Sequence, residues 1–463
     1  MIDPIVMSKL SLVQQKELLS MQIKKPEVDV NLLAKIISEN LFEGRGLVVS
    51  ELLRAVETIG PFAVDAGKQL WHFQSGVWRP NGIDELTQRV AFCTGTKYRK
   101  EHVAQVSSLL LARDPKIEGL GPRSLINVQN GMLDWKTGKL LPHDAKYFST
   151  YQLQMRWDPS ATCPTIIDWM NNTIDSNLHN LIWQIIGVTW YPAMGFQQAI
   201  ALIGGGKNGK GTLLRLCKAA LPDSACCAVD PKKLSENRFS SAELFGKTAN
   251  IVGDIERMTL NSTAEIKKIT GEDPVNAERK MGQPFTFISQ ATNLFAGNRM
   301  PKSSDTSFGW FRRWLIVPLE KTILGAPDLD LEPKMHAELE GALVLAVRGL
   351  KQAMEQGGFD TPDLVKEASK NYEYSCSSAA YFINESIEFD SRHTTPISRS
   401  QLVDAYENFC RSRRLFVESR HRLYELLEDL GSAHIKEKWL TRSVGSDERG
   451  FTGMRIVYAL PAY

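Results

Sequence analysis

The 463-residue chain lacks strong charge and long apolar segments. Its formal net charge is only +2, so a nucleic-acid surface could be only a local patch and not a property of the whole molecule. No apolar run approaches the roughly 18 residues that a membrane-spanning helix needs. The N-terminus, MIDPIVMSKLSLVQQ, has no cationic start followed by an apolar core, which argues against a secretory signal. We therefore expect a soluble, cytoplasmic protein with no membrane partner.

Cysteine is scarce and scattered. The seven residues show neither paired CxxC spacing nor a clustered framework, so a disulfide scaffold and a structural zinc site are not expected. Reduced thiols in a cytoplasmic compartment fit this pattern best. The cysteines are Cys93, Cys163, Cys217, Cys226, Cys227, Cys376 and Cys410.

What remains is an ordinary globular composition, with 43% hydrophobic and 23% charged residues, in a chain long enough for roughly three domains. No internal repeat or low-complexity segment interrupts it. Apolar spacing predicts helices at 83–113 and 165–190, and short strands at 70–79 and 124–157. The expected divisions are a helical N-terminal region at 1–69, a domain at 70–190, an α/β core at 191–325, a helical connector at 326–374 and a small C-terminal domain at 375–463.

A glycine-rich stretch, IALIGGGKNGKGTLL, joins a predicted strand to a predicted helix. It contains G-x-x-x-x-G-K, ending at Lys210, in the strand–loop–helix context that a phosphate-binding loop requires. Inward-pointing N–H groups and the helix N-terminus would hold phosphates, and Lys210 would contact the β- and γ-phosphates. Gly211 stands where a Mg²⁺-binding hydroxyl is expected, so Thr212 is the candidate ligand. A permissive glycine turn is the alternative. The expected ATP-binding residues are Gly204, Gly205, Gly206, Lys207, Asn208, Gly209, Lys210, Gly211 and Thr212.

Two acids end the next apolar strand, ANIVGDIE. A nucleotidase needs one carboxylate for Mg²⁺ and another to polarise the attacking water, and Asp254 and Glu256 could supply them. Both are expected at the end of a strand beside the phosphate-loop strand. The alternative is an edge strand running into a polar loop.

A polar amide and two arginines follow in turn. Asn298 ends the strand TNLFAG and could contact the γ-phosphate or orient water, although Asn-Arg-Met-Pro is also good turn chemistry. Arg312 and Arg313 precede an apolar strand. Because neighbouring strand residues face opposite ways, only one is expected to enter a nucleotide site, as a finger from a neighbouring subunit. A surface salt bridge is the alternative. The ordered set of lysine, acid, amide and arginine favours a nucleotidase more than any one member does.

These segments resemble superfamily-three helicases, and more closely the helicase portion of phage, plasmid and poxvirus primase–helicase proteins. The resemblance covers roughly 70–320. It implies an α/β fold with an AAA+-like P-loop ATPase core, usually a homo-hexamer, that uses ATP and Mg²⁺ to move 3′→5′ along single-stranded DNA. It assigns the metal-binding acid to Asp254, the base to Glu256, the sensor to Asn298 and the finger to Arg313. The matching text is INVQNGMLDWKTGKLLPHDAKYF, GGGKNGKGTLL, ANIVGDIE, IKKITGEDPVNAERKMGQPFTF, NLFAGNRMP and FGWFRRWLIVPL.

The resemblance also implies a DNA-binding hairpin. PVNAERKMGQPFTF has two strand-like arms around a turn, with Arg279 and Lys280 near its tip. A cation there would hold a backbone phosphate without reading bases, whereas a solvated basic turn is the alternative. Only about 70 residues precede the matching region, too few for a polymerase-like primase domain. Priming would therefore need a separate primase or polymerase, unless the chain is a fragment or a stand-alone helicase.

The C-terminal stretch predicts a winged-helix-like domain. Helical patterns at 400–414 and 420–430 precede two strand-like runs, and between Arg392 and Arg455 the 12 lysines and arginines outnumber 9 acids. This favours DNA binding, with a packed or solvated basic face as the alternative.

The predicted function is that of an ATP-hydrolysing DNA helicase in the replication of a phage or other mobile genetic element. Its expected substrates are single-stranded and forked DNA. Two alternatives stay open at this point: an origin-binding initiator that assembles with ATP without unwinding, and a small-molecule P-loop kinase.

Overall fold

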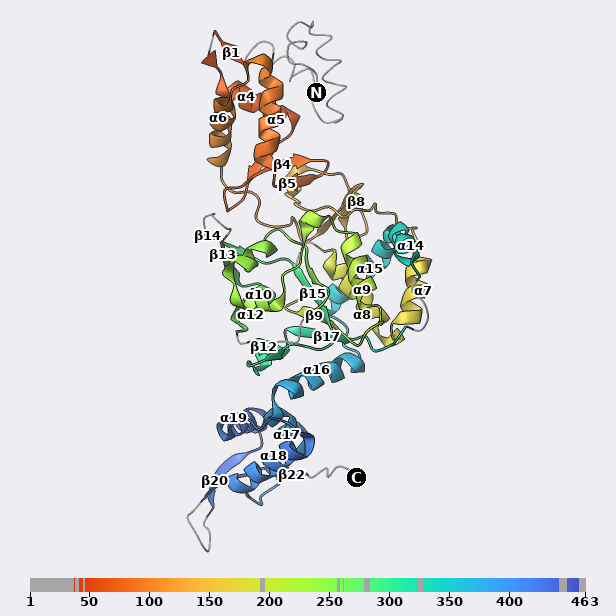
Figure 1. Cartoon of the computed structure of the whole chain (residues 1–463), viewed down its shortest axis with the longest axis vertical. Coiled ribbons are helices and arrows are strands. Elements are labelled where there is room, and N and C mark those ends of the chain that lie inside the picture. The colour runs from red at the N-terminus through yellow and green to blue at the C-terminus, as the bar shows by residue number, and fades with distance from the viewer. Residues whose placement is uncertain are drawn as a thin grey trace. The chain divides into compact units, whose positions relative to one another are not determined.

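The computed structural model of the chain describes residues 37, 41–44, 46–191, 196–255, 259–260, 262–278, 284–323, 328–440 and 448–457 (Figure 1). The predicted helices within residues 1–36 lie outside this set. Two compact units divide the chain. The first comprises Met1–Ile255, Ala264–Asn298 and Leu319–Asp360, and the second comprises Glu256–Thr263, Arg299–Pro318 and Thr361–Tyr463. No helix in the described ranges is long and apolar enough to cross a bilayer.

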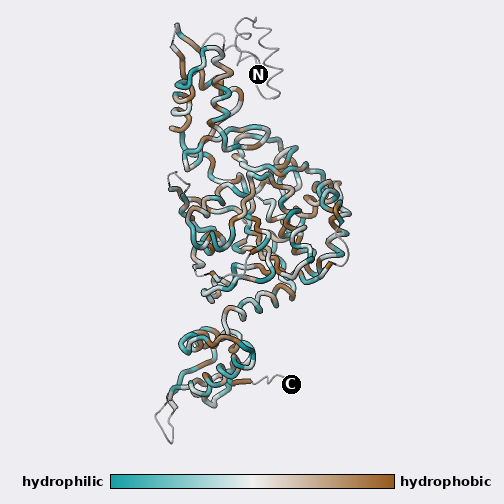
Figure 2. Tube along the Cα trace, viewed as in Figure 1, coloured by the Kyte–Doolittle hydropathy of each residue, from teal (hydrophilic) through white to brown (hydrophobic). Residues whose placement is uncertain are grey.

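The first unit begins with three helices around one apolar core. They are α4 (Val49–Ile59), α5 (Gly82–Thr94) and α6 (Lys100–Leu111), with the short pair β1 (Phe42–Glu43) and β2 (Gly46–Leu47) beside them in sequence. Apolar side chains at helical spacing supply the core, among them Val56, Val90 and Val106. Brown and teal segments alternate along these helices in Figure 2. The core therefore contains residues from both sides of the domain boundary that the sequence predicts at position 69.

Antiparallel strands and two helices come next, and the first strand lies in the region that was predicted to be helical. One sheet is formed by β3 (Phe62–Val64), β4 (Leu70–Gln74) and β5 (Val77–Arg79). A second is formed by β6 (Leu125–Val128), β7 (Gly131–Asp134) and β8 (Leu140–Leu141). The helices are α7 (Pro164–Thr173) and α8 (His179–Thr189). The predicted strands in 70–79 and 124–157 and the predicted helices in 165–190 are confirmed.

A five-stranded sheet forms the centre of the α/β part. Its strands are β9 (Ala199–Ile203), β10 (Cys226–Cys227), β11 (Ala249–Val252), β15 (Thr292–Gly297) and β17 (Trp314–Pro318), in the order β10-β11-β15-β9-β17. The pairs β10–β11, β11–β15 and β15–β9 are parallel. Strands of a parallel sheet are covered on both faces, which explains why their sequences are almost continuously apolar. The expectation that the acidic strand lies beside the phosphate-loop strand is wrong, because β15 pairs with both and separates β11 from β9.

Helices cover this sheet. α8 and α9 (Lys210–Ala219) contact β15, and α15 (Leu339–Gln356) packs on α8 (Figure 1). The other helices of this part are α10 (Pro231–Glu236), α11 (Arg238–Ser241), α12 (Ala264–Gly271) and α14 (Leu331–Ala337). Strands β13 (Pro274–Glu278) and β14 (Pro284–Ile288) form an antiparallel hairpin, which confirms the two predicted arms. The rings of Phe285 and Phe287 on β14 contact Phe245 at 5.4 and 5.5 Å between centroids.

The second unit ends in a helix–helix–hairpin domain, as predicted. α18 (Arg399–Arg413) and α19 (Arg420–Gly431) precede β20 (Lys436–Leu440) and β21 (Glu448–Thr452), and β19 (Ile397–Ser398) pairs with β21 to give a three-stranded sheet. The remaining elements are β12 (Thr259–Leu260), β16 (Lys302–Ser303), α13 (Phe308–Phe311), α16 (Asp363–Cys376), α17 (Ser378–Ser386), β18 (Ile387–Phe389) and β22 (Met454–Ile456).

Candidate nucleotide-binding site

Three predicted site segments leave the central sheet at one edge. Gly297 at the end of β15 pairs with Ile203 at the end of β9, and the Gly204 N–H donates to the Gly297 carbonyl at 3.3 Å. Beyond β11, the Ile255 N–H donates to the Ala296 carbonyl at 2.8 Å. The loops that follow these parallel strands carry the predicted lysine, aspartate and asparagine. The carboxyl edge of such a sheet is where ligands bind in open α/β folds.

The glycine loop passes into α9 through a residue in the left-handed conformation. Gly209 caps the helix at φ 79°, and α9 begins at Lys210. A Cβ atom on Gly209 would collide with Thr173 Cγ2 and approach Trp169 Cζ2 to 3.2 Å. Both the left-handed backbone and the neighbouring α7 therefore require glycine here.

The Lys210 ammonium lies within the curl of this loop. Its Nζ donates to the carbonyls of Gly204 and Gly205, each at 2.7 Å, and to Asn208 Oδ1 at 2.9 Å. Burial lowers the pKa of Lys210, and the charge of Asp254 acts in the opposite direction.

A buried amide ties the loop to the chain after β17. Asn208 Nδ2 donates to the Leu319 carbonyl at 2.6 Å, while the Leu319 N–H donates to the Ile203 carbonyl at 2.7 Å. Farther along, the Ile323 N–H donates to the Lys207 carbonyl at 2.7 Å. The sequence places Asn208 among the ATP-binding residues but does not reveal this bracing role. The available signal was a polar residue directly before Gly209 in a glycine-rich loop.

The central glycines are open to a ligand. Gly205 and Gly206 are exposed, and a Cβ atom built on either would have no neighbour within 4 Å. Gly204 differs, because a Cβ atom there would collide with the Leu319 carbonyl. The loop thus has one glycine that packing requires and two whose backbone N–H groups a ligand could approach.

The predicted metal ligands lie on this same edge. Thr212, in the first turn of α9, is partly buried, and its hydroxyl accepts a bond from Arg215 at 3.4 Å. Arg215 also pairs with Glu332 at 2.5 Å, a contact that sequence reasoning did not foresee. Asp254 and Asn298 are exposed at the ends of their strands. Their roles toward Mg²⁺ and phosphate stay predictions.

Three other predicted site residues, Glu256, Arg279 and Lys280, lie outside the described residues. Arg313 belongs to the second unit, where its guanidinium donates to the Gly309 carbonyl at 2.8 Å, and Arg312 next to it is more exposed. The finger role of Arg313 stays a prediction.

The cysteines are all unpaired. Burial raises the pKa of the Cys93, Cys217 and Cys227 thiols to about 12. Within the described ranges, no group of three or more His, Cys, Asp or Glu side chains could hold a metal ion.

Comparison with known proteins gives two family matches and a set of similar structures. Residues 58–175 match the family described as D5 N terminal like, and residues 202–313 match one described as Family of unknown function (DUF5906). The A form apo structure of the NrS-1 C terminal region has a TM-score of 0.54 at 10% identity, covering 87% of this chain and 98% of that chain. A structure of its residues 305–718 has a TM-score of 0.53 at 11% identity, with the same coverage.

At such low identity these structures establish a likeness of fold. The D5 N terminal like match and the match to the family of unknown function each cover about a quarter of the chain.

Proposed function

We propose that this chain is an ATP-driven DNA helicase of the superfamily-three type that serves replication of a phage or other mobile element. The observation that carries the proposal is that the strands preceding Lys210, Asp254 and Asn298 end at one edge of a parallel sheet. The D5-type match supports a replication role. ATP hydrolysis, ring assembly and strand separation are the parts that need testing.

The residues present fit a nucleoside triphosphate with Mg²⁺. The loop combines exposed glycine N–H groups with the N-terminus of α9, an arrangement that favours anions. Lys210 now donates to carbonyls of its own loop, and charged phosphate oxygens are stronger acceptors for its ammonium. Thr212 and Asp254 would hold Mg²⁺, which neutralises charge developing on the phosphates.

The other predicted site residues have proposed roles in hydrolysis and in DNA binding. Asn298 would position water or sense the γ-phosphate, and Glu256 would take a proton from that water. Arg313 would reach the nucleotide of a neighbouring subunit in a homo-hexameric ring. The β13–β14 hairpin, whose arms the structure describes, would carry Arg279 and Lys280 to one phosphate of the DNA strand. A separate primase or polymerase would supply primers.

The test uses the full chain with forked DNA. We expect DNA-stimulated ATP hydrolysis and separation of a fork that carries a 3′ single-stranded tail, with Lys210→Ala as the inactive control. A matching fork with only a 5′ tail tests the polarity. DNA-stimulated hydrolysis and ring formation without strand separation would instead identify an ATP-dependent initiator. Phosphoryl transfer to a small molecule, without stimulation by DNA, would identify a kinase.

A further inference from the structure

The loop between α18 and α19 presents an unusually exposed aromatic ring. Phe416 is 82% exposed and Val417 beside it is 42% exposed, although the domain has a well-formed apolar core only a few residues away. A single exposed apolar residue is ordinary at a protein surface. What distinguishes Phe416 is how the loop holds it and which charges surround it.

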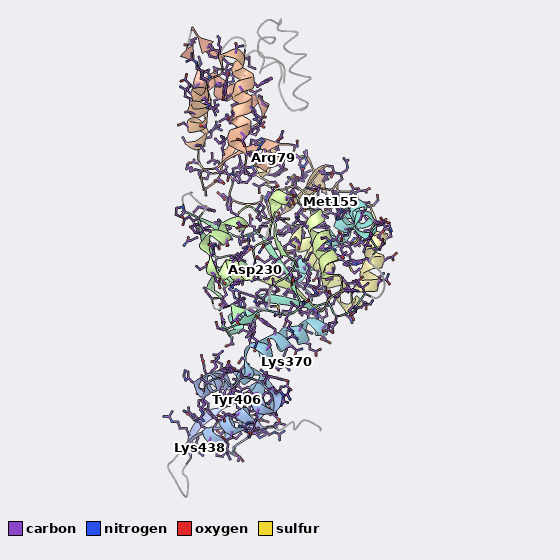
Figure 3. The ribbon with its side chains drawn as sticks, viewed as in Figure 1. Arg79, Met155, Asp230, Lys370, Tyr406 and Lys438 are labelled. Atoms are coloured by element: carbon purple, nitrogen blue, oxygen red, sulfur yellow. The ribbon has the colours of Figure 1, made fainter. Side chains whose placement is uncertain are left out.

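Both ends of the loop are fixed. Before Phe416, the Leu415 N–H donates to the Cys410 carbonyl at 2.9 Å, and the Leu415 side chain packs against the core. After it, the Glu418 N–H donates to the Tyr406 hydroxyl at 2.8 Å (Tyr406 is labelled in Figure 3). The Glu418 carboxylate accepts from the Ala379 N–H, also at 2.8 Å, at the start of α17. The ring is therefore held outward by its neighbours.

The surroundings of this ring are strongly basic. Residues 408–422 contain five arginines and a single acid, Glu418, which is the carboxylate already bonded within the domain. Arg411, Arg414 and Arg420 are exposed, and Arg420 lies 3.7 Å from Glu407 on α18 in a largely exposed ion pair that phosphate can compete for. Arg414 ends α18 in a left-handed conformation at φ 55°, a position where glycine is the usual residue. An arginine therefore occupies a position whose backbone conformation favours glycine.

The rest of α19 is less suited to nucleic acid. From Glu425 onward the helix is acidic, with Glu428 and Asp429 following, and Glu425 already pairs with Arg422 at 2.8 Å. Phosphates running along the whole helix would meet these carboxylates. The favourable charge is confined to the junction of the two helices, where the exposed phenylalanine lies.

We propose that this junction is a binding site for single-stranded DNA, in which Phe416 stacks on a base and Arg411, Arg414 and Arg420 bind the neighbouring phosphates. Aromatic rings accept any base by stacking, and guanidinium groups pair well with phosphate oxygens. The inference rests on the proposed function, because it takes DNA as the substrate. It locates a contact for the unpaired arm of a fork at the α18–α19 junction.

The test measures binding of a fluorescein-labelled oligo-dT strand to the full chain by anisotropy, without nucleotide. Phe416→Ala should weaken binding roughly tenfold, within the range found for losing one base–aromatic stack. Phe416→Trp should keep the affinity, whereas Phe416→Leu should lose it, since leucine restores apolar area but offers no ring. The matched control is Leu329→Ala, which removes a side chain that is 87% exposed but stands between two aspartates.

Three results would overturn the proposal in distinguishable ways. Parental affinity in Phe416→Ala would remove the stacking site but leave the helicase proposal standing. Parental affinity in Phe416→Leu would mean that an apolar contact, and not base stacking, is made there. Absence of DNA binding by the parent chain would refute the proposed function as well. If the site is right, Arg414→Ala should also make the affinity less dependent on salt, by about one released counterion.

Discussion

Replacing Gly209 with alanine tests whether the glycine loop is built around the contact with α7. Two penalties apply. Holding a non-glycine residue at φ 79° costs about 1–2 kcal/mol. The added methyl group also collides with Thr173 Cγ2 in a buried site, and overpacking of this kind costs about 1–3 kcal/mol. Together they predict that Gly209→Ala lowers the free energy of unfolding by about 2–5 kcal/mol.

A second substitution separates the two penalties. Thr173→Ser deletes the methyl group that the new Cβ would strike and keeps the hydroxyl. In that background, Gly209→Ala should cost only the conformational part, about 1–2 kcal/mol. The coupling energy of the cycle should therefore be about 1–3 kcal/mol, the overpacking part alone.

Gly205 supplies the matched control for this cycle. A Cβ atom there meets nothing within 4 Å, so Gly205→Ala should change stability by less than about 0.5 kcal/mol. Its methyl group would nevertheless stand on the exposed side of the loop where phosphates are proposed to bind. We therefore expect weaker ATP binding from Gly205→Ala in a fully stable protein.

The assay is urea unfolding followed by tryptophan fluorescence, with ATP binding measured in parallel. Because chains with more than one compact unit seldom unfold in a single step, the compared quantity is the shift of the transition that Gly209→Ala perturbs. Additive effects of Gly209→Ala and Thr173→Ser would refute the steric argument. A stable Gly209→Ala variant would refute both parts of it.

Three further predictions concern the site and the thiols. Lys210→Ala should abolish ATP turnover. In the parent chain, at a pH just below the usual lysine pKa, ATP binding should take up protons, because phosphate charge raises the lowered pKa of Lys210. Calorimetry in buffers of different ionisation enthalpy measures this uptake, and binding heats that do not depend on the buffer would contradict it. Burial raises the pKa of the Cys93 and Cys217 thiols to about 12. At pH 8 both should therefore react with iodoacetamide on the order of a thousand times more slowly in the native chain than in urea, as followed by mass spectrometry. Equal rates in the two conditions would show that the thiols are accessible in the native chain. Mixing Arg313→Ala subunits with Lys210→Ala subunits should restore some ATPase activity if the arginine acts on a neighbour's nucleotide, and no recovery at any ratio would argue against that role.

Much of the local structure could be predicted because its signals are short-range. The apolar strand, the glycines and Lys210 predicted a strand–loop–helix unit, which the structure confirms from β9 to α9. The two arms of the β13–β14 hairpin and the helix–helix–hairpin order of the C-terminal domain were predicted in the same way. In each case, hydrophobic period and turn residues within about 30 positions carry the information.

Pairing between distant strands could not be predicted from such signals. The sequence places Asp254 after the second major strand and Asn298 after the third, and chain order suggested that the acidic strand adjoins β9. Hydrogen bonding instead places β15 between them. Parallel strands need long crossovers, so their order depends on how the intervening helices pack and not on sequence adjacency.

The sequence alone determined which chemical groups this protein has available: a flexible glycine loop, a lysine at a helix start, acids and an amide at strand ends, and a basic C-terminal segment. Only the tertiary structure decided what each position must do. Contact with Thr173 makes Gly209 a packing requirement, the Leu319 carbonyl makes Asn208 a brace, and the bonds of Glu418 hold Phe416 outward. These constraints come from residues far apart in the chain, and they exist only once folding has brought the atoms into van der Waals and hydrogen-bonding range.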